Sequence, residues 1–188
     1  MAAHRVALTE LILVTNRPDS FRHLGVPIIS DVFPGAGPLA GIHAALQWAR
    51  GEGAAGICCT PCDAPFANPA LLSMLVEASR EPAVLAVLPE STGPLGYEPL
   101  FAWYSIETLP VLTARLEAGK TAVHTFIESL ERKALLPLPR IQSIGEPEVL
   151  FLNVNTPADL ERAREALSIA DPGTPRAVPS GGDHSVEG

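Results

Sequence analysis

The chain has 188 residues, which suits one domain of ordinary size with a sizeable buried core. Hydrophobic residues make up 47% of it and charged residues 18%, a composition that excludes an intrinsically disordered protein. A net charge of −8 and the lack of a Lys/Arg cluster argue against a surface for nucleic acid or anionic membrane, although a metal ion and backbone N–H groups could still neutralise one nucleotide.

Strand-like and helix-like segments alternate along the chain. Short apolar runs predict strands, and apolar residues spaced for one face predict helices. In chain order these are strand 10–15, strand 26–30, helix 42–50, a strand from residue 57, helix 69–79, strand 83–88, strand 100–104, helix 106–118, helix 121–133, strand 149–152 and a helix from residue 157. Thr156 is expected to cap the last helix. This alternation predicts an α/β fold with a doubly wound, mostly parallel sheet in three α/β/α layers.

We expect one domain over residues 1–170. Residues 171–188 are rich in Pro, Gly and Ser without periodicity, and we expect a disordered tail there. No apolar run approaches the roughly 20 residues that span a bilayer, and the N-terminal residues lack the layout of a signal peptide. The sequence therefore predicts a cytoplasmic protein.

Asp63 ends the segment Ile57-Cys-Cys-Thr-Pro-Cys-Asp63, in which Pro61 stops a buried strand. Ligands of open α/β sheets bind outside the carboxyl ends of the strands. A carboxylate at that edge suits Mg²⁺ bridged to a substrate phosphate. The alternative is a structural role, in which Asp63 caps the helix that Asn68-Pro69 opens.

The three cysteines, Cys58, Cys59 and Cys62, all belong to this segment. A zinc site needs further ligands, for which His43 and His124 are only guesses. The spacing from Cys59 to Cys62 matches a C-x-x-C redox motif, but such motifs normally precede a helix directly. Because cysteine is among the most frequently buried residue types, we expect reduced core thiols.

Polar residues fall at or just beyond several predicted strand ends. In a parallel sheet these positions converge on one rim. They are Asn16, Asp31, the stretch 35–41, Asp63, Glu98, Asn153 and Asn155. Gly35, Gly37 and Gly41 permit close approach of a ligand to the backbone, although a plain turn into a helix would use glycine as well. The stretch is not a P-loop, since the Gly-Lys-Ser/Thr ending is absent.

The chain resembles the molybdenum cofactor guanylyltransferases, which are nucleotidyltransferases with a Rossmann-like core. Six segments follow in the order and spacing of that family over residues 11–167. They are Leu13-Val-Thr-Asn-Arg17, Ile29-Ser-Asp31, Pro34-Gly-Ala-Gly-Pro-Leu-Ala-Gly41, Thr60-Pro-Cys-Asp-Ala-Pro-Phe66, Tyr97-Glu-Pro-Leu100 and Asn153-Val-Asn-Thr-Pro157.

The resemblance implies transfer of GMP from GTP to molybdopterin-bound molybdenum, which gives the guanine dinucleotide cofactor and pyrophosphate. By this analogy Asp63 looks like the carboxylate that holds Mg²⁺, and it is the catalytic candidate. The nucleotide-binding candidates are Asn16, Asp31, Gly37, Pro38, Leu39, Gly41 and Asp63.

The same resemblance assigns the acceptor side of the site. Asn153 and Asn155 look like the segment facing the pterin, and Glu98 and Lys120 match positions that line the cleft. The implied partners are GTP and the molybdopterin cofactor, and molybdoenzymes or cofactor-insertion proteins are further candidates.

The sequence departs from the family at its N-terminal motif. Members begin with a strand, a Leu-Ala-Gly-Gly-type loop that cradles the triphosphate, and a lysine, none of which occurs here. We expect loss of that first strand to expose the edges of its two neighbours, and loss of the cradle to leave this chain inactive or weak.

Three explanations stay open: a start site further upstream, a degenerate homologue that serves as a binding or partner module, and a strand supplied by another chain. The choice of guanine over cytosine, and the identity of the acceptor, rest on the resemblance alone.

Overall fold

The computed structural model describes residues 10–170, so the predicted tail lies outside the described residues. The elements are β1 (Leu13–Val14), α1 (Pro18–Phe21), η1 (Arg22–Leu24), β2 (Ile28–Ile29), α2 (Pro38–Gly51), β3 (Gly56–Cys58), α3 (Pro69–Ala78), β4 (Ala86–Pro89), β5 (Trp103–Ser105), η2 (Ile106–Thr108), α4 (Leu109–Glu117), α5 (Val123–Glu128), β6 (Lys133–Leu136), α6 (Leu138–Gln142), α7 (Pro147–Leu150) and α8 (Pro157–Ala170).

Within residues 10–170 the strands form two sheets rather than one. β1 and β2 make a two-stranded parallel sheet, and the other sheet has the order β3-β5-β4-β6. β4 and β6 are parallel, whereas β5 runs antiparallel to both of its neighbours. A parallel connection from β4 to β5 would need a crossover of a dozen or more residues, usually a helix. Residues 90–102 contain no helix, so they do not provide such a crossover.

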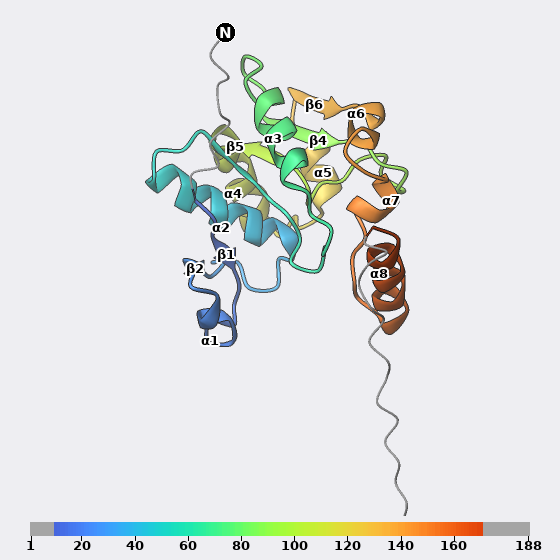
Figure 1. The fold of residues 1–188 in the computed structure, drawn as a ribbon. Coiled ribbons are helices and arrows are strands. Elements are labelled where there is room, and N and C mark those ends of the chain that lie inside the picture. The colour runs from blue at the N-terminus through green and yellow to red at the C-terminus, as the bar shows by residue number, and fades with distance from the viewer. Residues whose placement is uncertain (1–9, 171–188) are drawn as a thin grey trace, which may run out of the picture.

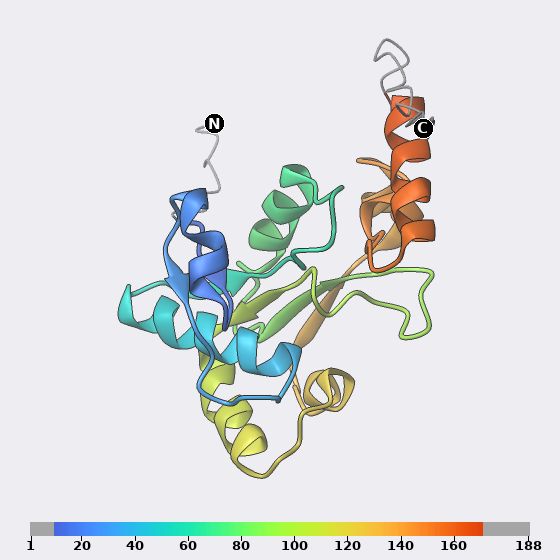
Figure 2. The same ribbon diagram turned by 90° about the horizontal axis from the view of Figure 1, so that it is seen from below.

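Helices cover both faces of the larger sheet, as Figures 1 and 2 show. On β4, the side chains of Ala86 and Leu88 join a buried cluster with α2, α4 and α5, whereas Val87 joins a second cluster with α3, α6 and α7. Tyr104 and Trp103 on β5 divide in the same way. All four residues of β4 are buried, as expected for a strand between two helical layers. The predicted three-layer α/β/α fold is therefore confirmed.

Two predicted elements are wrong. The strand expected over 149–152 is helix α7, which Pro147 starts and whose Leu150 is buried in the second cluster. The helix expected over 121–133 ends at Glu128, and Lys133–Leu136 instead pairs with β4 as strand β6.

The last helix begins as expected. Thr156 Oγ1 accepts the N–H of Asp159 at 3.2 Å, and Asp159 Oδ2 accepts the N–H of Thr156 at 2.9 Å. This reciprocal capping satisfies backbone donors that a helix start would leave free. No helix within residues 10–170 is both long and apolar enough to cross a membrane.

Candidate functional site

The parallel pairing of β1 and β2 brings Asn16 and Asp31 together. The register sets Leu13 beside Ile28 and Val14 beside Ile29, so both strands end at the same edge. Asn16 Nδ2 donates to Asp31 Oδ2 at 2.7 Å. The second oxygen, Asp31 Oδ1, is buried and has no hydrogen-bond partner in the described structure. A buried carboxylate oxygen without a donor is costly, and Asp31 Oδ1 has the capacity to accept one further N–H or O–H.

The glycine-rich stretch leads directly into α2. Gly35 and Gly37 have φ values of 78° and 65°, which other residues rarely adopt, and the next residue, Pro38, is the first of the helix. Gly41 lies against β1, since a Cβ added there would lie 3.9 Å from Val14 Cγ1. Leu39 is fully buried in the core, so the structure does not support its place among the nucleotide-binding candidates.

Asp63 lies in the turn between β3 and α3 and is half-buried. Its carbonyl oxygen accepts the N–H of Val154 at 2.8 Å, which joins the turn to the segment holding Asn153 and Asn155. The cap of α3 is Asn68, whose Oδ1 accepts the N–H of Ala70 at 2.8 Å. The capping role considered for Asp63 therefore belongs to Asn68, and Asp63 itself is not among the residues lining the cavities described below.

A cavity of about 240 Å³, the rim cavity, lies beside this turn. Its walls include Pro61, which precedes Asp63 by two residues, together with Tyr97, Glu98, Phe101 and Asn153. Two of the predicted acceptor residues, Glu98 and Asn153, thus share one hollow next to the Asp63 turn. Burial raises the pKa of the Glu98 carboxyl, while a hydrogen bond with Ser91 lowers it.

The sequence did not assign a site role to Ser91 or Tyr97, although Tyr97 opens the family-like segment Tyr97-Glu-Pro-Leu100. Ser91 Oγ accepts the N–H of Gly93 at 3.3 Å, and Tyr97 forms an antiparallel bridge with Glu90. These contacts hold the loop that carries Glu98 over the cavity. For Ser91 the sequence signal was the density of turn residues between positions 90 and 98.

Lys120 and Asn155 are not among the residues lining the rim cavity. Lys120 is exposed in the turn after α4, and its N–H donates to the carbonyl of Arg115 at 2.9 Å. Asn155 is exposed, and its N–H donates to Asp159 Oδ2 at 3.1 Å, so its backbone belongs to the start of α8.

The cysteines are free thiols. Burial raises the pKa of Cys58 to about 12 and that of Cys59 to about 11, so both stay protonated and unreactive at neutral pH. Cys59 Sγ points at the carbonyl of Ala102, 3.4 Å away. Residues 10–170 contain no group of three or more His, Cys, Asp or Glu side chains that could hold a metal ion.

The donor set at Asp63 nevertheless fits magnesium. Mg²⁺ is usually held by one or two carboxylates, with substrate phosphates and water completing its shell. A single half-exposed carboxylate at the sheet edge meets that requirement, whereas an all-protein cage would not be expected.

The comparisons with known proteins place this geometry in a family. Residues 1–134 match the family described as MobA-like NTP transferase domain. A probable molybdenum cofactor guanylyltransferase of Pelotomaculum thermopropionicum is 34% identical over 155 residues, which are 82% of this chain and 72% of the relative. The molybdenum cofactor guanylyltransferase of Desulfosudis oleivorans is 30% identical over 84% of this chain and 75% of its own length.

A solved structure agrees with these matches. The molybdopterin-guanine dinucleotide biosynthesis protein A of Archaeoglobus fulgidus superposes with a TM-score of 0.70 and 26% identity, covering 84% of this chain and 78% of its own. The chain belongs to the family of MobA-like NTP transferase domains, and hence to the nucleotidyltransferase enzymes.

Proposed function

We propose that this protein transfers the GMP group of GTP to the terminal phosphate of the molybdopterin-bound molybdenum cofactor and releases pyrophosphate. The names of the relatives supply the substrates. The observation that carries the proposal is the hydrogen bond between the Asp63 carbonyl and the Val154 N–H, because it joins the turn that holds Asp63 to the segment of Asn153, which lines the rim cavity.

One group of residues is assigned to the nucleotide and a second group to the acceptor. Asp31, with its unpartnered oxygen, and the Asn16 amide beside it are assigned to the nucleotide. The backbone of Gly37, Pro38 and Gly41, which is not buried, is assigned to it as well. Glu98 and Asn153 are assigned to the acceptor, because both line the rim cavity. Asp63 is assigned to the phosphates of the two substrates, since it lies in the turn after β3 and its carbonyl bonds to Val154, next to Asn153.

The reaction is an in-line displacement. An oxygen of the acceptor phosphate forms a bond to the α-phosphorus of GTP, the bond from that phosphorus to the bridging oxygen breaks, and pyrophosphate leaves with the electron pair. A Mg²⁺ ion held by Asp63 would neutralise charge on the phosphates. Positioning of the two substrates supplies most of the remaining rate, as in other phosphoryl-group transfers.

We expect slow turnover. Within residues 10–170, neither cavity is lined by a Lys or Arg side chain, since Glu10 and Glu98 are the only charged residues of that part of the chain that line them. The triphosphate then meets a metal ion and backbone N–H groups but no side-chain cation within these cavities. A single missing donor of this kind lowers a rate by about 10²–10³-fold.

The test is pyrophosphate release from GTP in the presence of molybdopterin cofactor. We expect release that requires Mg²⁺ and the acceptor, and that falls at least about 100-fold in Asp63→Asn. Glu107→Gln is the matched control, since Glu107 lies in η2 and lines neither cavity. Release that is independent of the acceptor, or unchanged in Asp63→Asn, would contradict the proposal.

The base is tested in the same assay. If CTP supports release as fast as GTP, the protein is not a guanylyltransferase. If both nucleotides bind but neither yields pyrophosphate, the chain is a binding module of the same family.

A further inference from the structure

Residues 32–37, which we call the nucleotide loop, connect Asp31 to the start of α2 and are mostly exposed. Both glycines of the loop have positive φ values, and glycine restricts the backbone less than any other residue. Two side chains of the loop reach the protein interior. Ala36 is buried, and Phe33 packs against the core cluster that α2, α4 and α5 share. The position of the loop therefore depends on what holds Phe33.

The ring that meets Phe33 is that of His43, in the second turn of α2, which is 1% exposed. The centroids of the two rings are 5.0 Å apart and their planes meet at 82°, an edge-to-face arrangement. Aromatic pairs in this geometry stabilise a contact beyond the effect of the area that they bury. His43 therefore links the nucleotide loop to the body of α2.

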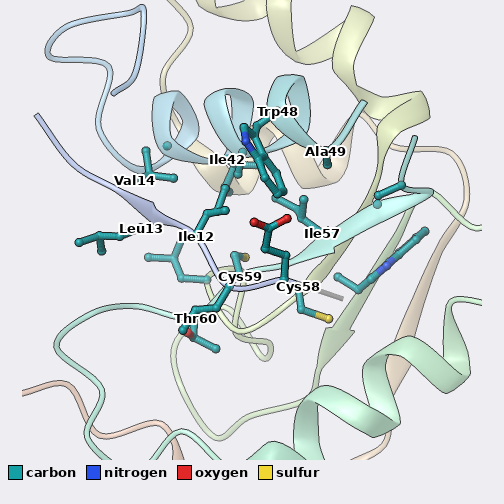
Figure 3. Close-up of a pocket in the computed structure, with 18 of the residues that line it drawn as sticks. Ile12, Leu13, Val14, Ile42, Trp48, Ala49, Ile57, Cys58, Cys59 and Thr60 are labelled. Atoms are coloured by element: carbon teal, nitrogen blue, oxygen red, sulfur yellow. The ribbon is translucent and has the colours of Figure 1, made fainter. Parts of the chain in front are cut away.

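The opposite side of α2 faces a second cavity, of about 550 Å³, between β1 and β3. Figure 3 shows Ile42, Trp48 and Ala49 of the helix at its wall. His43 is not among the residues lining this cavity or the rim cavity, because it points toward α4. Any effect of His43 on a substrate must therefore pass through the loop.

A hydrogen bond to α4 fixes the plane of the His43 ring. Its Nε2 lies 3.0 Å from Thr113 Oγ1. The Thr113 hydroxyl donates to the Leu109 carbonyl at 2.8 Å, so Thr113 Oγ1 accepts from His43. Burial, and to a lesser extent Arg50, lowers the pKa of His43, while Glu117 raises it. The ring is therefore neutral at neutral pH, with its one proton on Nε2.

The other ring nitrogen of His43, Nδ1, is buried and has no hydrogen-bond partner in the described structure. An unsatisfied buried acceptor costs free energy, which a phenylalanine at this position would avoid. Core packing alone therefore does not account for a histidine here. What His43 adds to an apolar ring is the bond to Thr113, which sets the angle at which the ring meets Phe33.

Phe33 in turn orders the residues around it. Its carbonyl accepts the N–H of Ala36 at 3.1 Å, which closes the turn that contains Gly35. Phe33 also follows Asp31 by two residues, and Asn16 holds the Asp31 carboxylate at 2.7 Å. A binding loop that is ordered in advance loses less conformational entropy when its ligand binds.

We propose that His43 is a positioning residue for the nucleotide: oriented by Thr113, its ring fixes Phe33 and so orders the nucleotide loop before GTP binds. His43 makes no contact with either substrate, and its effect falls on GTP affinity rather than on the chemical step. This role rests on the proposed function, in which Asp31 and Gly37 contact the nucleotide.

The first measurement uses the whole chain without nucleotide. Hydrogen exchange at the Ala36 N–H reports whether the turn closed by the Phe33 carbonyl stays closed. His43→Gln keeps an N–H donor but removes the ring, and exchange at Ala36 should rise at least about tenfold. The Ser105 N–H, which donates to the Leu85 carbonyl at 2.9 Å, reports the larger sheet and should not change. An equal rise at both amides would indicate a general loss of stability and would overturn the proposal.

The second measurement is the rate of pyrophosphate release at varied GTP concentration. His43→Gln should raise KM for GTP at least about tenfold and change kcat by less than about twofold. His43→Phe keeps a ring but loses the bond to Thr113, and should raise KM by only about threefold. Gln47→Ala is the matched control, since Gln47 is an exposed residue of the same helix. A fall in kcat with KM unchanged would contradict a positioning role.

The partner ring gives a third test. Phe33→Leu removes the other half of the same contact, so its KM should rise as in His43→Gln, and the double variant should be no worse than either single variant. Additive effects would show that the two residues act independently and would overturn the proposal. If the wild type does not bind GTP, the proposed function fails, and exchange at Ala36 alone decides whether His43 orders the loop.

Discussion

Gly56 on β3 has no room for a side chain, and this makes a sharp test of the sheet geometry. A Cβ at this position would lie 2.4 Å from the carbonyl oxygen of Tyr104 and 2.6 Å from Trp103 Cζ2. Tyr104 is fully buried and Trp103 is 8% exposed, so neither can move aside cheaply. The substitution Gly56→Ala should therefore push β3 away from β5.

The magnitude follows from two opposing effects. Overpacking a close-packed interior costs about 1–3 kcal/mol, and here both clashing groups are rigid. Replacing a strand glycine otherwise gains about 0.5–1 kcal/mol. We expect Gly56→Ala to lower the free energy of unfolding by about 2 kcal/mol, a large part of the 5–15 kcal/mol typical of a domain.

Gly51, the last residue of α2, is the matched control. A Cβ there meets nothing within 4 Å, and its φ is not positive. The same chemical change, Gly51→Ala, should raise the free energy of unfolding by about 0.5–1 kcal/mol. Urea unfolding followed by circular dichroism should separate the two midpoints by about 1–3 M. A Gly56→Ala protein as stable as Gly51→Ala would refute the β3–β5 register.

The remaining predictions concern buried polar groups and a helix cap. Burial, and to a lesser extent Arg50, lowers the pKa of His43, while Glu117 raises it. The unfolded chain therefore binds the proton more tightly than the folded chain does. The free energy of unfolding is highest above the unfolded pKa of about 6.5. It falls as the pH drops below that value, by at most about 1.4 kcal/mol per pH unit. Subtracting the pH profile of His43→Gln should isolate this slope, and identical profiles would contradict it. Asn68→Ala removes the cap of α3 and the 3.2 Å bond to the Ile144 carbonyl, and thermal unfolding should show a loss of about 1–2 kcal/mol, with Ser20→Ala as an exposed control. Tyr104→Phe leaves the Pro99 carbonyl without its 2.7 Å donor and should cost about 1–2 kcal/mol, and a neutral result would mean that the loop carrying Glu98 is held by other contacts.

The sequence was informative wherever local chemistry decided the structure. Asp63 lies in a turn after β3, although that strand ends at Cys58, three residues before Pro61, and Thr156 capped α8 as predicted. The sequence-based prediction was wrong where pairing with residues far along the chain decided the secondary structure. Lys133–Leu136 has no local strand signal and becomes β6 because it pairs with β4, and the run 149–152 is short enough to suit either a strand or a buried helical turn.

For the candidate site, too, local features could be predicted from the sequence and long-range contacts could not. The candidate residues could be named from strand ends, but their contacts depend on register. The Asn16–Asp31 bond follows from the β1–β2 pairing, and the Asp63–Val154 bond joins positions far apart in sequence. The orphaned Asp31 oxygen has no sequence signature, because it arises from packing.

The central claim is that Asp63 holds the divalent ion that carries a nucleoside triphosphate. Isothermal titration of GTP into the wild type and into Asp63→Asn, each with and without Mg²⁺, tests it most directly. We expect Mg²⁺ to tighten GTP binding to the wild type at least about tenfold, a gain of about 1.4 kcal/mol, and to leave Asp63→Asn unaffected. An equal effect of Mg²⁺ on both proteins would place the metal elsewhere and contradict the account.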